Sequence, residues 1–186
     1  MPLSAPAPRE AIHTRQIECQ GYLRDDGLWD IEANLTDVKS YSVERNWRGA
    51  VAPGDPIHDL WVRLTVSDDL LIIAIETASD VTPYAECPNV AKNFQDLVGV
   101  RIAPGWKRQI KSRVGGVKGC THIVELMNVL ATVAFQTIFS LKEKSLMADG
   151  KRPPMLDNCL AWSTSGPVVK AQYPAWYKED ENASDS

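Results

Sequence analysis

The hydrophobic pattern of the chain changes its period near the middle, and this change restricts the fold more than any other feature. Up to about residue 77, apolar and polar residues alternate, which is typical of half-buried strands. From Pro88 onward, apolar residues recur at helical spacing. Strands that come first and helices that follow favour the α+β class. We therefore predict an antiparallel sheet of four to five strands packed against three helices, the last of them long and central.

The first two strands are predicted to form a hairpin. The run 12–24 is extended, and Asp25, Asp26 and Gly27 give an Asp-Gly turn signal. The run 28–37 then alternates, with apolar residues at every second position from Trp29 to Leu35. Antiparallel pairing of the two runs follows from the short turn between them.

Two further strands are predicted after a long loop over 39–56. The run 57–66 alternates, and the run 70–77 is apolar on both faces at its start, which suits a central strand. A last segment, 167–177, is predicted to add an edge strand that Pro174 limits.

Three helices are predicted in the second half. The first begins at Pro88 and ends at Gly99, since proline is favoured in a first turn and glycine after a last one. A short basic helix begins at Pro104 and ends before Gly115. The run 121–142 is apolar nearly all round, so we expect it to cross the sheet at its centre.

The length and composition suit one soluble domain. The 186 residues and the hydrophobic fraction of 44% allow a substantial core. We expect a flexible arm over 1–10, a single domain over 11–177 and a disordered acidic tail over 178–186. The net charge of −4 argues against nucleic acid as a partner, because such binding needs basic residues to neutralise phosphates.

The sequence also predicts a cytoplasmic protein that does not bind a membrane. Its most apolar stretch, 126–135, is interrupted by Asn128 and is too short to cross a bilayer, and the first residues do not resemble an export signal. The four cysteines are scattered without a C-x-x-C pair, so we expect reduced thiols.

Ionisable residues share the apolar face of two predicted strands. His13 and Arg15 have the parity of Ile17 and Cys19, and His58 has the parity of Leu60. An ionisable group on a buried face needs a partner or a shifted pKa. The pattern indicates an acid/base pocket at one end of the sheet, unless these strand ends splay into solvent.

The densest group of reactive residues opens the predicted central helix. Cys120 precedes His122 and Glu125, and the positive end of a helix lowers the pKa of a thiol. Three uses are open: a cysteine nucleophile, a zinc or iron site with Cys87, Cys120 and His122 as ligands, or a structural or anion-binding helix start.

Between Leu97 and Val124 the chain carries six basic residues and no acidic one: Arg101, Lys107, Arg108, Lys111, Arg113 and Lys118. Such a stretch attracts a carboxylate, a phenolate or a phosphate. The alternative is a solvated helix face.

Carboxylates and aromatic rings provide further candidates. Asp30 and Glu32 lie two apart on the polar face of the second strand, where they form a carboxylate pair if something covers that face. The chain has six tryptophans, and Trp61 has the parity opposite to the apolar set. Aromatic side chains outside a core often line ligand pockets or subunit interfaces, so we expect an aromatic ligand, a homodimer, or both.

Several of these segments together resemble a bacterial family known only as a domain of unknown function, number twenty-eight eighty-nine. They are His13-Thr-Arg15, Gly21-Tyr-Leu-Arg-Asp-Asp-Gly-Leu-Trp-Asp-Ile-Glu32, Ile57-His-Asp-Leu-Trp61, Gly105-Trp106 and Gly119-Cys-Thr-His-Ile-Val-Glu-Leu126. The resemblance covers residues 12–142. It implies a bacterial cytosolic protein of aromatic-compound catabolism and lignin degradation, of the type of the lyases that release formaldehyde from a hydroxymethyl side chain.

That reaction needs a base, an electron sink in the substrate and no cofactor. The catalytic candidates are His13, His58, Arg15 and Tyr22. The candidates for substrate binding are Arg24, Asp30, Glu32, Trp61, Tyr84, His122 and Glu125. Two other functions stay open: a metal-binding or cluster-scaffold protein and a non-catalytic module that binds an aromatic ligand.

Overall fold

The computed structural model describes residues 3–44, 47–146 and 150–179, with the side chains of Lys144 and Leu146 left out. The chain divides into two compact units, residues 1–140 and residues 141–186. The predicted domain boundaries of 11 and 177 stay a prediction, and most of the predicted tail, 180–186, lies outside the described residues.

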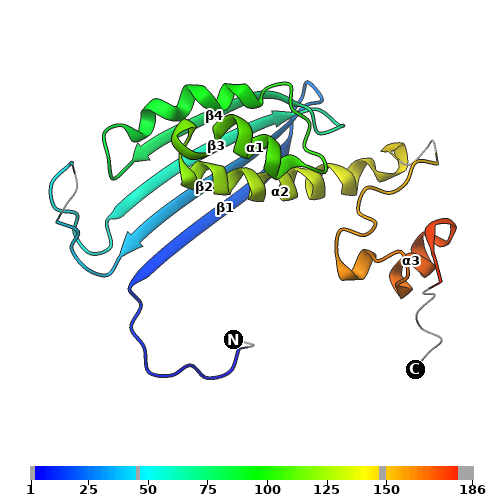
Figure 1. Cartoon of the computed structure of the whole chain (residues 1–186), viewed down its shortest axis with the longest axis horizontal. Helices are drawn as coiled ribbons and strands as arrows, with labels where there is room; N and C mark the ends of the chain where they lie inside the picture. Colours follow the sequence, from blue (N-terminus) through cyan, green and yellow to red (C-terminus); the bar gives the residue numbers. More distant parts are fainter. Residues whose placement is uncertain (1–2, 45–46, 147–149, 180–186) are drawn as a thin grey trace. The chain divides into compact units, whose positions relative to one another are not determined.

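The first unit contains a four-stranded antiparallel sheet in the order β1-β2-β3-β4 (Figure 1). The strands are β1 (His13–Leu23), β2 (Trp29–Lys39), β3 (Pro56–Val66) and β4 (Ile72–Val81). Gly27 has a positive φ of 81° in the turn between β1 and β2, and Arg24 N donates to Leu28 O at 2.9 Å. The predicted hairpin and the α+β fold are therefore confirmed.

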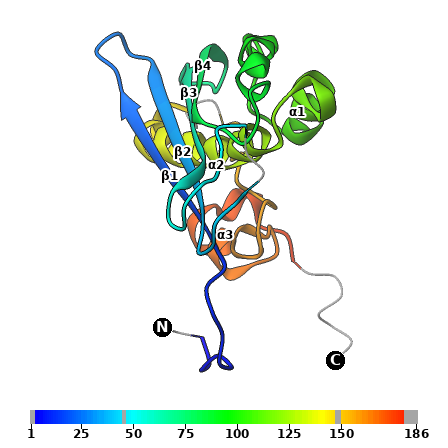
Figure 2. The ribbon, with the colours of Figure 1, turned by 90° about the vertical axis from the view of Figure 1, so that its left-hand side faces the viewer.

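The helices of this unit cover one face of the sheet (Figure 2). They are η1 (Cys87–Leu97), a 3₁₀-helix, then α1 (Trp106–Val114), the short η2 (Gly116–Lys118) and α2 (Thr121–Leu146). Every second residue of β2 from Trp29 to Leu35 is at most 2% exposed and packs in one core with α2 residues such as Leu126 and Leu130. The period-two pattern therefore corresponds to a sheet with one covered and one open face.

Two details of the first unit differ from the predictions. The helix predicted from Pro88 is a 3₁₀-helix that begins at Cys87, with Pro88 in its first turn. β4 lies at an edge of the sheet rather than in its interior, so the prediction of a central strand is wrong. The chain after η1 pairs with its free edge, since Ile72 N donates to Val100 O at 3.0 Å and Gly99 N to Ile72 O at 2.8 Å, while Ile73 on the open face is 42% exposed.

α2 is longer than the apolar stretch considered above. By length and composition alone, Thr121–Glu143 would suffice to cross a membrane, so its exclusion on length was wrong. The helix buries Ile123, Leu126, Met127 and Leu130 in the core of the first unit. A core helix of a soluble protein passes the same test, and the arrangement is compatible with a soluble protein.

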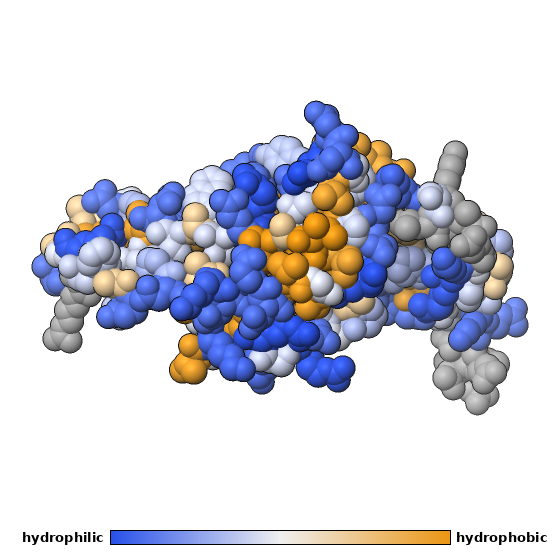
Figure 3. All heavy atoms as spheres, turned by 90° about the horizontal axis from the view of Figure 1, so that it is seen from above, coloured by the Kyte–Doolittle hydropathy of each residue, from blue (hydrophilic) through white to orange (hydrophobic). Residues whose placement is uncertain are grey.

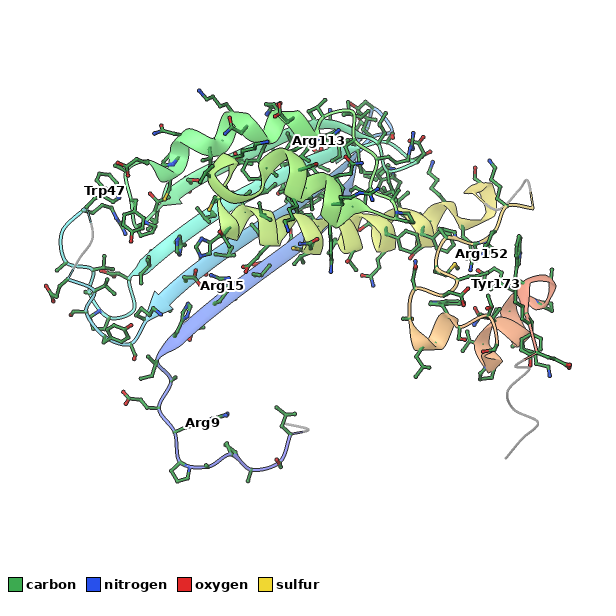
Figure 4. All side chains as sticks on the ribbon, viewed as in Figure 1. Arg9, Arg15, Trp47, Arg113, Arg152 and Tyr173 are labelled. Carbon is green, nitrogen blue, oxygen red and sulfur yellow. The ribbon has the colours of Figure 1, made fainter. Side chains whose placement is uncertain are left out.

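The second unit holds the end of α2 and three short elements: η3 (Leu160–Trp162), α3 (Pro167–Gln172) and η4 (Pro174–Trp176). The edge strand predicted over 167–177 is therefore wrong. Pro167 occupies the first turn of α3, where its missing N–H costs nothing, and Val169 is buried. Tyr173 donates to Glu143, and Arg152 pairs with Asp157 at 2.6 Å (Figure 4).

The molecular surface is mixed in character. Seen from above, it is mostly hydrophilic with an apolar patch near the middle (Figure 3). Exposed apolar residues are ordinary on soluble proteins, since polar side chains are too few to cover a whole surface.

Candidate functional site

Asp37 lies at the centre of a cluster of ionisable side chains. It continues the buried parity of β2 and is 2% exposed. In the register of the sheet, Asp37 stands opposite Arg15 of β1 on one side and opposite His58 of β3 on the other. Side chains directly opposite in neighbouring strands lie on the same face and interact. The register of the sheet therefore places Arg15, Asp37 and His58 in one row across three strands.

Both carboxylate oxygens of Asp37 are fully hydrogen-bonded. Oδ1 accepts from Arg15 Nε at 2.8 Å and from His13 Nε2 at 2.9 Å. Oδ2 accepts from Arg15 Nη2 at 2.8 Å and from His58 Nδ1 at 2.9 Å. An ionised carboxylate only accepts, so both histidines must present an N–H to it. For His58 this leaves Nε2 as the nitrogen with a free lone pair.

The start of α2 supplies the other half of the cluster. The His122 ring lies 3.9 Å from the His58 ring between centroids, at 41°. Glu125 accepts from Arg15 Nη1 at 2.5 Å, so Arg15 on β1 bridges the sheet and the helix (Figure 4). His13, with 40% of its side chain exposed, and Glu125, with 50%, open the cluster to solvent.

The surroundings of Asp37 keep it ionised. Burial on its own would raise its pKa, but the hydrogen bonds from Arg15 and His13 and the charges of Arg15 and His58 outweigh burial. The pKa of Asp37 therefore lies well below its ordinary value. Asp37 is consequently a fixed negative charge that orients His58.

The pKa values of His58 and His122 are displaced in opposite directions. Burial, and then the positive charge of His122, lower the pKa of His58 against the opposing influence of Asp37. A hydrogen bond with Cys120 raises the pKa of His122, with Sγ 3.7 Å from Nδ1. Neighbouring groups whose pKa values are driven apart are the usual signature of a paired base and acid.

Cys120 holds its thiol at the beginning of α2. Burial on its own would raise the pKa of Cys120, but the hydrogen bond from His122 and those from the backbone N–H groups of Ile123 and His122 outweigh it and lower the pKa. Gly119 precedes it because a Cβ there would lie 2.1 Å from Val114 O. The tight turn thus fixes where Cys120 and His122 enter the cluster.

The structure brings together five of the eleven side chains predicted for catalysis or substrate binding: His13, Arg15, His58, His122 and Glu125. The other six lie elsewhere. Tyr22 donates to Gln20, Arg24 pairs with Asp26 and Asp30, and Tyr84 is 63% exposed. Glu32 and Trp61 line a separate cavity of about 260 Å³ that also contains Arg63 and Glu76. Their roles stay predictions, but they form no part of the cluster.

Sequence reasoning missed Asp37. It is the next member of the alternating series that runs from Trp29 to Leu35, so an acidic residue on the buried parity of β2 was visible in the pattern. A histidine and an arginine on a buried face each need a partner of opposite charge. The carboxylate of Asp37, on the same face of the neighbouring strand, supplies it.

The described residues also contain a group with metal-ligand chemistry. Single ligand atoms of Asp37, His58 and His122 lie within 4.8 Å of one another, a carboxylate with two imidazoles. This set differs from the predicted one, since Asp37 and His58 replace Cys87 and Cys120. Both Asp37 oxygens already accept from Arg15, so a bound cation would have to displace a guanidinium.

Comparison with known proteins places the chain in a family. A search of curated proteins and a search of solved structures each gave no match. A family model described as "Protein of unknown function (DUF2889)" matches residues 13–136. This range runs from the first residue of the cluster, His13, past its last, Glu125. The chain belongs to this family of unknown function.

Proposed function

We propose that the chain is a cofactor-independent acid/base enzyme of the carbon–carbon lyase type, which releases formaldehyde from a hydroxymethyl side chain of a lignin-derived phenolic aromatic. The observation that carries the acid/base part is the pair His58 and His122, 3.9 Å apart, with pKa values displaced in opposite directions. The substrate class rests on the resemblance of the sequence segments given above.

The chemistry assigns one role to each histidine. A substrate with a leaving oxygen on the benzylic carbon and a –CH₂OH group on the next carbon can lose both. His122, as imidazolium, protonates the leaving oxygen, and the phenol becomes a quinone methide as its own proton departs. His58 Nε2 takes the hydroxyl proton, the C–C bond breaks and its electron pair flows into the quinone methide. The products are formaldehyde, the protonated leaving group and an alkenyl phenolate, which regains from solvent the proton that the phenol lost to it. His58 returns its extra proton to solvent and His122 regains one, so no redox cofactor is needed.

Arg15 and Asp37 act as positioning residues in this scheme. Arg15 is bound to Asp37 and Glu125, so it holds the base in place rather than the substrate. We further propose that the enzyme works in the cytoplasm as a homodimer.

The test is formaldehyde release from hydroxymethyl phenolics, with the alkenyl product identified by mass. We expect His58→Gln to lower kcat by about 10²–10⁴-fold, the usual contribution of a positioned base. Asp59→Asn is a matched control, because Asp59 lies next to His58 on the opposite face of β3 and binds Asn34 at 2.7 Å. Full activity in the folded His58→Gln variant would overturn the assignment of the base.

The pH profile of kcat/KM, which reports the free enzyme, gives a second readout. The active form has His58 neutral and His122 protonated, so the rate should fall below the lowered pKa of His58 and above the raised pKa of His122. Cys120→Ser weakens the partner that raises the pKa of His122, so the alkaline limb should move to lower pH. A folded Cys120→Ser variant with an unmoved alkaline limb would remove His122 as the acid.

A metal-binding function is the second candidate, favoured by the closeness of Asp37, His58 and His122. The hydrogen bonds from Arg15 and His13 to Asp37 argue against it, since a cation and a guanidinium compete for the same oxygens. Metal content after purification without chelator separates the two candidates. One zinc or iron per chain, lost in Asp37→Asn, would favour the metal site over the acid/base pair.

A further inference from the structure

A cavity separate from the cluster lies between α1 and α2. Its volume is about 320 Å³, which is in the range of small-molecule sites. Its apolar walls come from Ile110 and Val114 of α1 and Val124 of α2. The cavity uses the side of α2 that carries Val124 and Asn128, whereas the acid/base cluster uses His122 and Glu125.

Two lysines that pair with no described residue line this cavity. Of the basic stretch between Leu97 and Val124, Arg101 binds Asp69, Arg113 binds Asp96 O (Figure 4) and Lys118 binds Ser112 O. Lys107 and Lys111, one helical turn apart on α1, make no hydrogen bond or ion pair with any residue that the structure describes.

One residue of the lining carries an acceptor that lacks a donor among the described residues. Asn128 lines the cavity, and its Oδ1 is buried without a hydrogen-bond partner in the part of the chain that the structure describes. Its Nδ2 contacts Val124 O at 3.5 Å, the limit of a hydrogen bond. Unpaired buried acceptors are rare in native proteins. Oδ1 is closed off in this conformation, so a ligand would reach it by a rotation of the amide about χ2, which is a soft torsion.

We infer that this cavity binds a small hydroxylated aromatic carboxylate. The carboxylate pairs with Lys107 and Lys111, the ring packs between the walls of α1 and α2, and the hydroxyl donates to Asn128 Oδ1. Each part of the ligand matches one property of the site: the carboxylate matches the two lysines, the ring matches the apolar walls and the hydroxyl matches the unpaired acceptor.

The test is titration of the full chain with 4-hydroxybenzoate by calorimetry, with benzoate as the ligand that lacks the donor. We expect one site per chain, tighter binding of 4-hydroxybenzoate than of benzoate, and weaker binding at high salt. The double variant Lys107→Gln/Lys111→Gln should weaken binding about tenfold, as expected for loss of charge-assisted contacts at a partly exposed site. Asn128→Leu should remove the preference for 4-hydroxybenzoate over benzoate.

Two controls locate the binding. Arg108→Gln removes a positive charge from the same helix at a residue outside the cavity lining, so binding should change less than twofold. His58→Gln alters the acid/base cluster and should leave this binding intact. No saturable binding, an equal loss in Arg108→Gln, or loss in His58→Gln would each overturn the inference. Formaldehyde release is measured in a separate assay, so absence of 4-hydroxybenzoate binding would overturn this inference without contradicting the proposed lyase activity.

Discussion

At the level of single residues, Asp37 holds three side chains together through one buried carboxylate. Arg15 is always charged, and His13 and His58 both point an N–H at the same carboxylate. Removing a buried partner leaves the others uncompensated, which costs more than the pair contributes by its presence.

We therefore predict that Asp37→Asn lowers the free energy of unfolding by about 2–3 kcal/mol near pH 7. The folded pKa of Asp37 is lowered, so its stabilisation is complete above the unfolded value of about 3.9 and is lost as pH falls toward the folded value. The difference between the two proteins should therefore shrink below about pH 4. Urea unfolding at a series of pH values measures it.

The double variant Arg15→Gln/Asp37→Asn gives the control for that experiment. Because Arg15 and Asp37 share two hydrogen bonds, their effects should be strongly non-additive. Additive losses would show that the pair does not act as a unit.

Cys120 provides a second prediction at this scale. The hydrogen bond with His122 is the main influence that lowers its pKa, so its thiolate fraction at pH 7 should exceed that of an ordinary thiol and iodoacetamide should modify it faster. In His122→Ala the modification should slow several-fold, while Cys159, which is exposed in the second unit, should react at an unchanged rate. Mass spectrometry of the modified peptides distinguishes the two thiols. Equal slowing at both positions would point to a global change instead.

At the level of elements, the close approach of β1 and α2 brings the side chains of the cluster together. A Cβ at Gly21 would lie 2.3 Å from Thr137 Oγ1 and 2.8 Å from its Cγ2, so glycine lets α2 lie directly on the strand. The same approach, further along both elements, brings Arg15 to Glu125.

We predict that Gly21→Ala destabilises the fold by about 1–3 kcal/mol through overpacking. Thr137→Ala in the same chain should restore most of that loss, because it removes the atoms that the new methyl group meets. Thermal unfolding of both variants and of Thr137→Ala alone completes the cycle. Absence of rescue would mean that β1 and α2 do not pack as described.

Elements with a long, regular period were predictable from the sequence. The alternation of β2 and β3 and the apolar run of α2 correspond to a half-buried sheet and a core helix. The secondary structure of the segment 167–177 was not predictable in this way, because a helix of six residues such as α3 is too short to show a hydrophobic period. The position of β4 was predicted wrongly because its start is apolar on both faces, although Ile73 lies 42% exposed on the open face of the sheet.

The candidate site was predictable only in part, for a related reason. Strand parity identified His13, Arg15 and His58, and the same parity contains Asp37. That His122 lies against His58 depends on where α2 crosses the sheet. Tyr22 lies at the far end of β1 and Arg24 just follows the strand, so both lie beside the turn at Gly27 and away from the cluster.

At the level of the whole molecule, the two faces of the sheet carry different groups of ionisable side chains. Helices cover one face, and the other is open. Figure 2 shows the helices of the first unit on one side, and the ionisable cluster lies between that side of the sheet and α2. The other side carries carboxylates that pair on the surface, such as Glu32 with Arg63 at 2.6 Å. Covering one face thus turns ordinary histidines into a pair of unequal basicity.

That inequality is the central claim, and it can be measured without a substrate. The chain has three histidines, so NMR titration of their ring C–H signals, assigned with His→Gln variants, follows each one. We predict a midpoint for His58 below the ordinary value of about 6.5 and a midpoint for His122 above it. Coincident midpoints, or His58 titrating above His122, would contradict the assignment of His58 as the base and His122 as the acid.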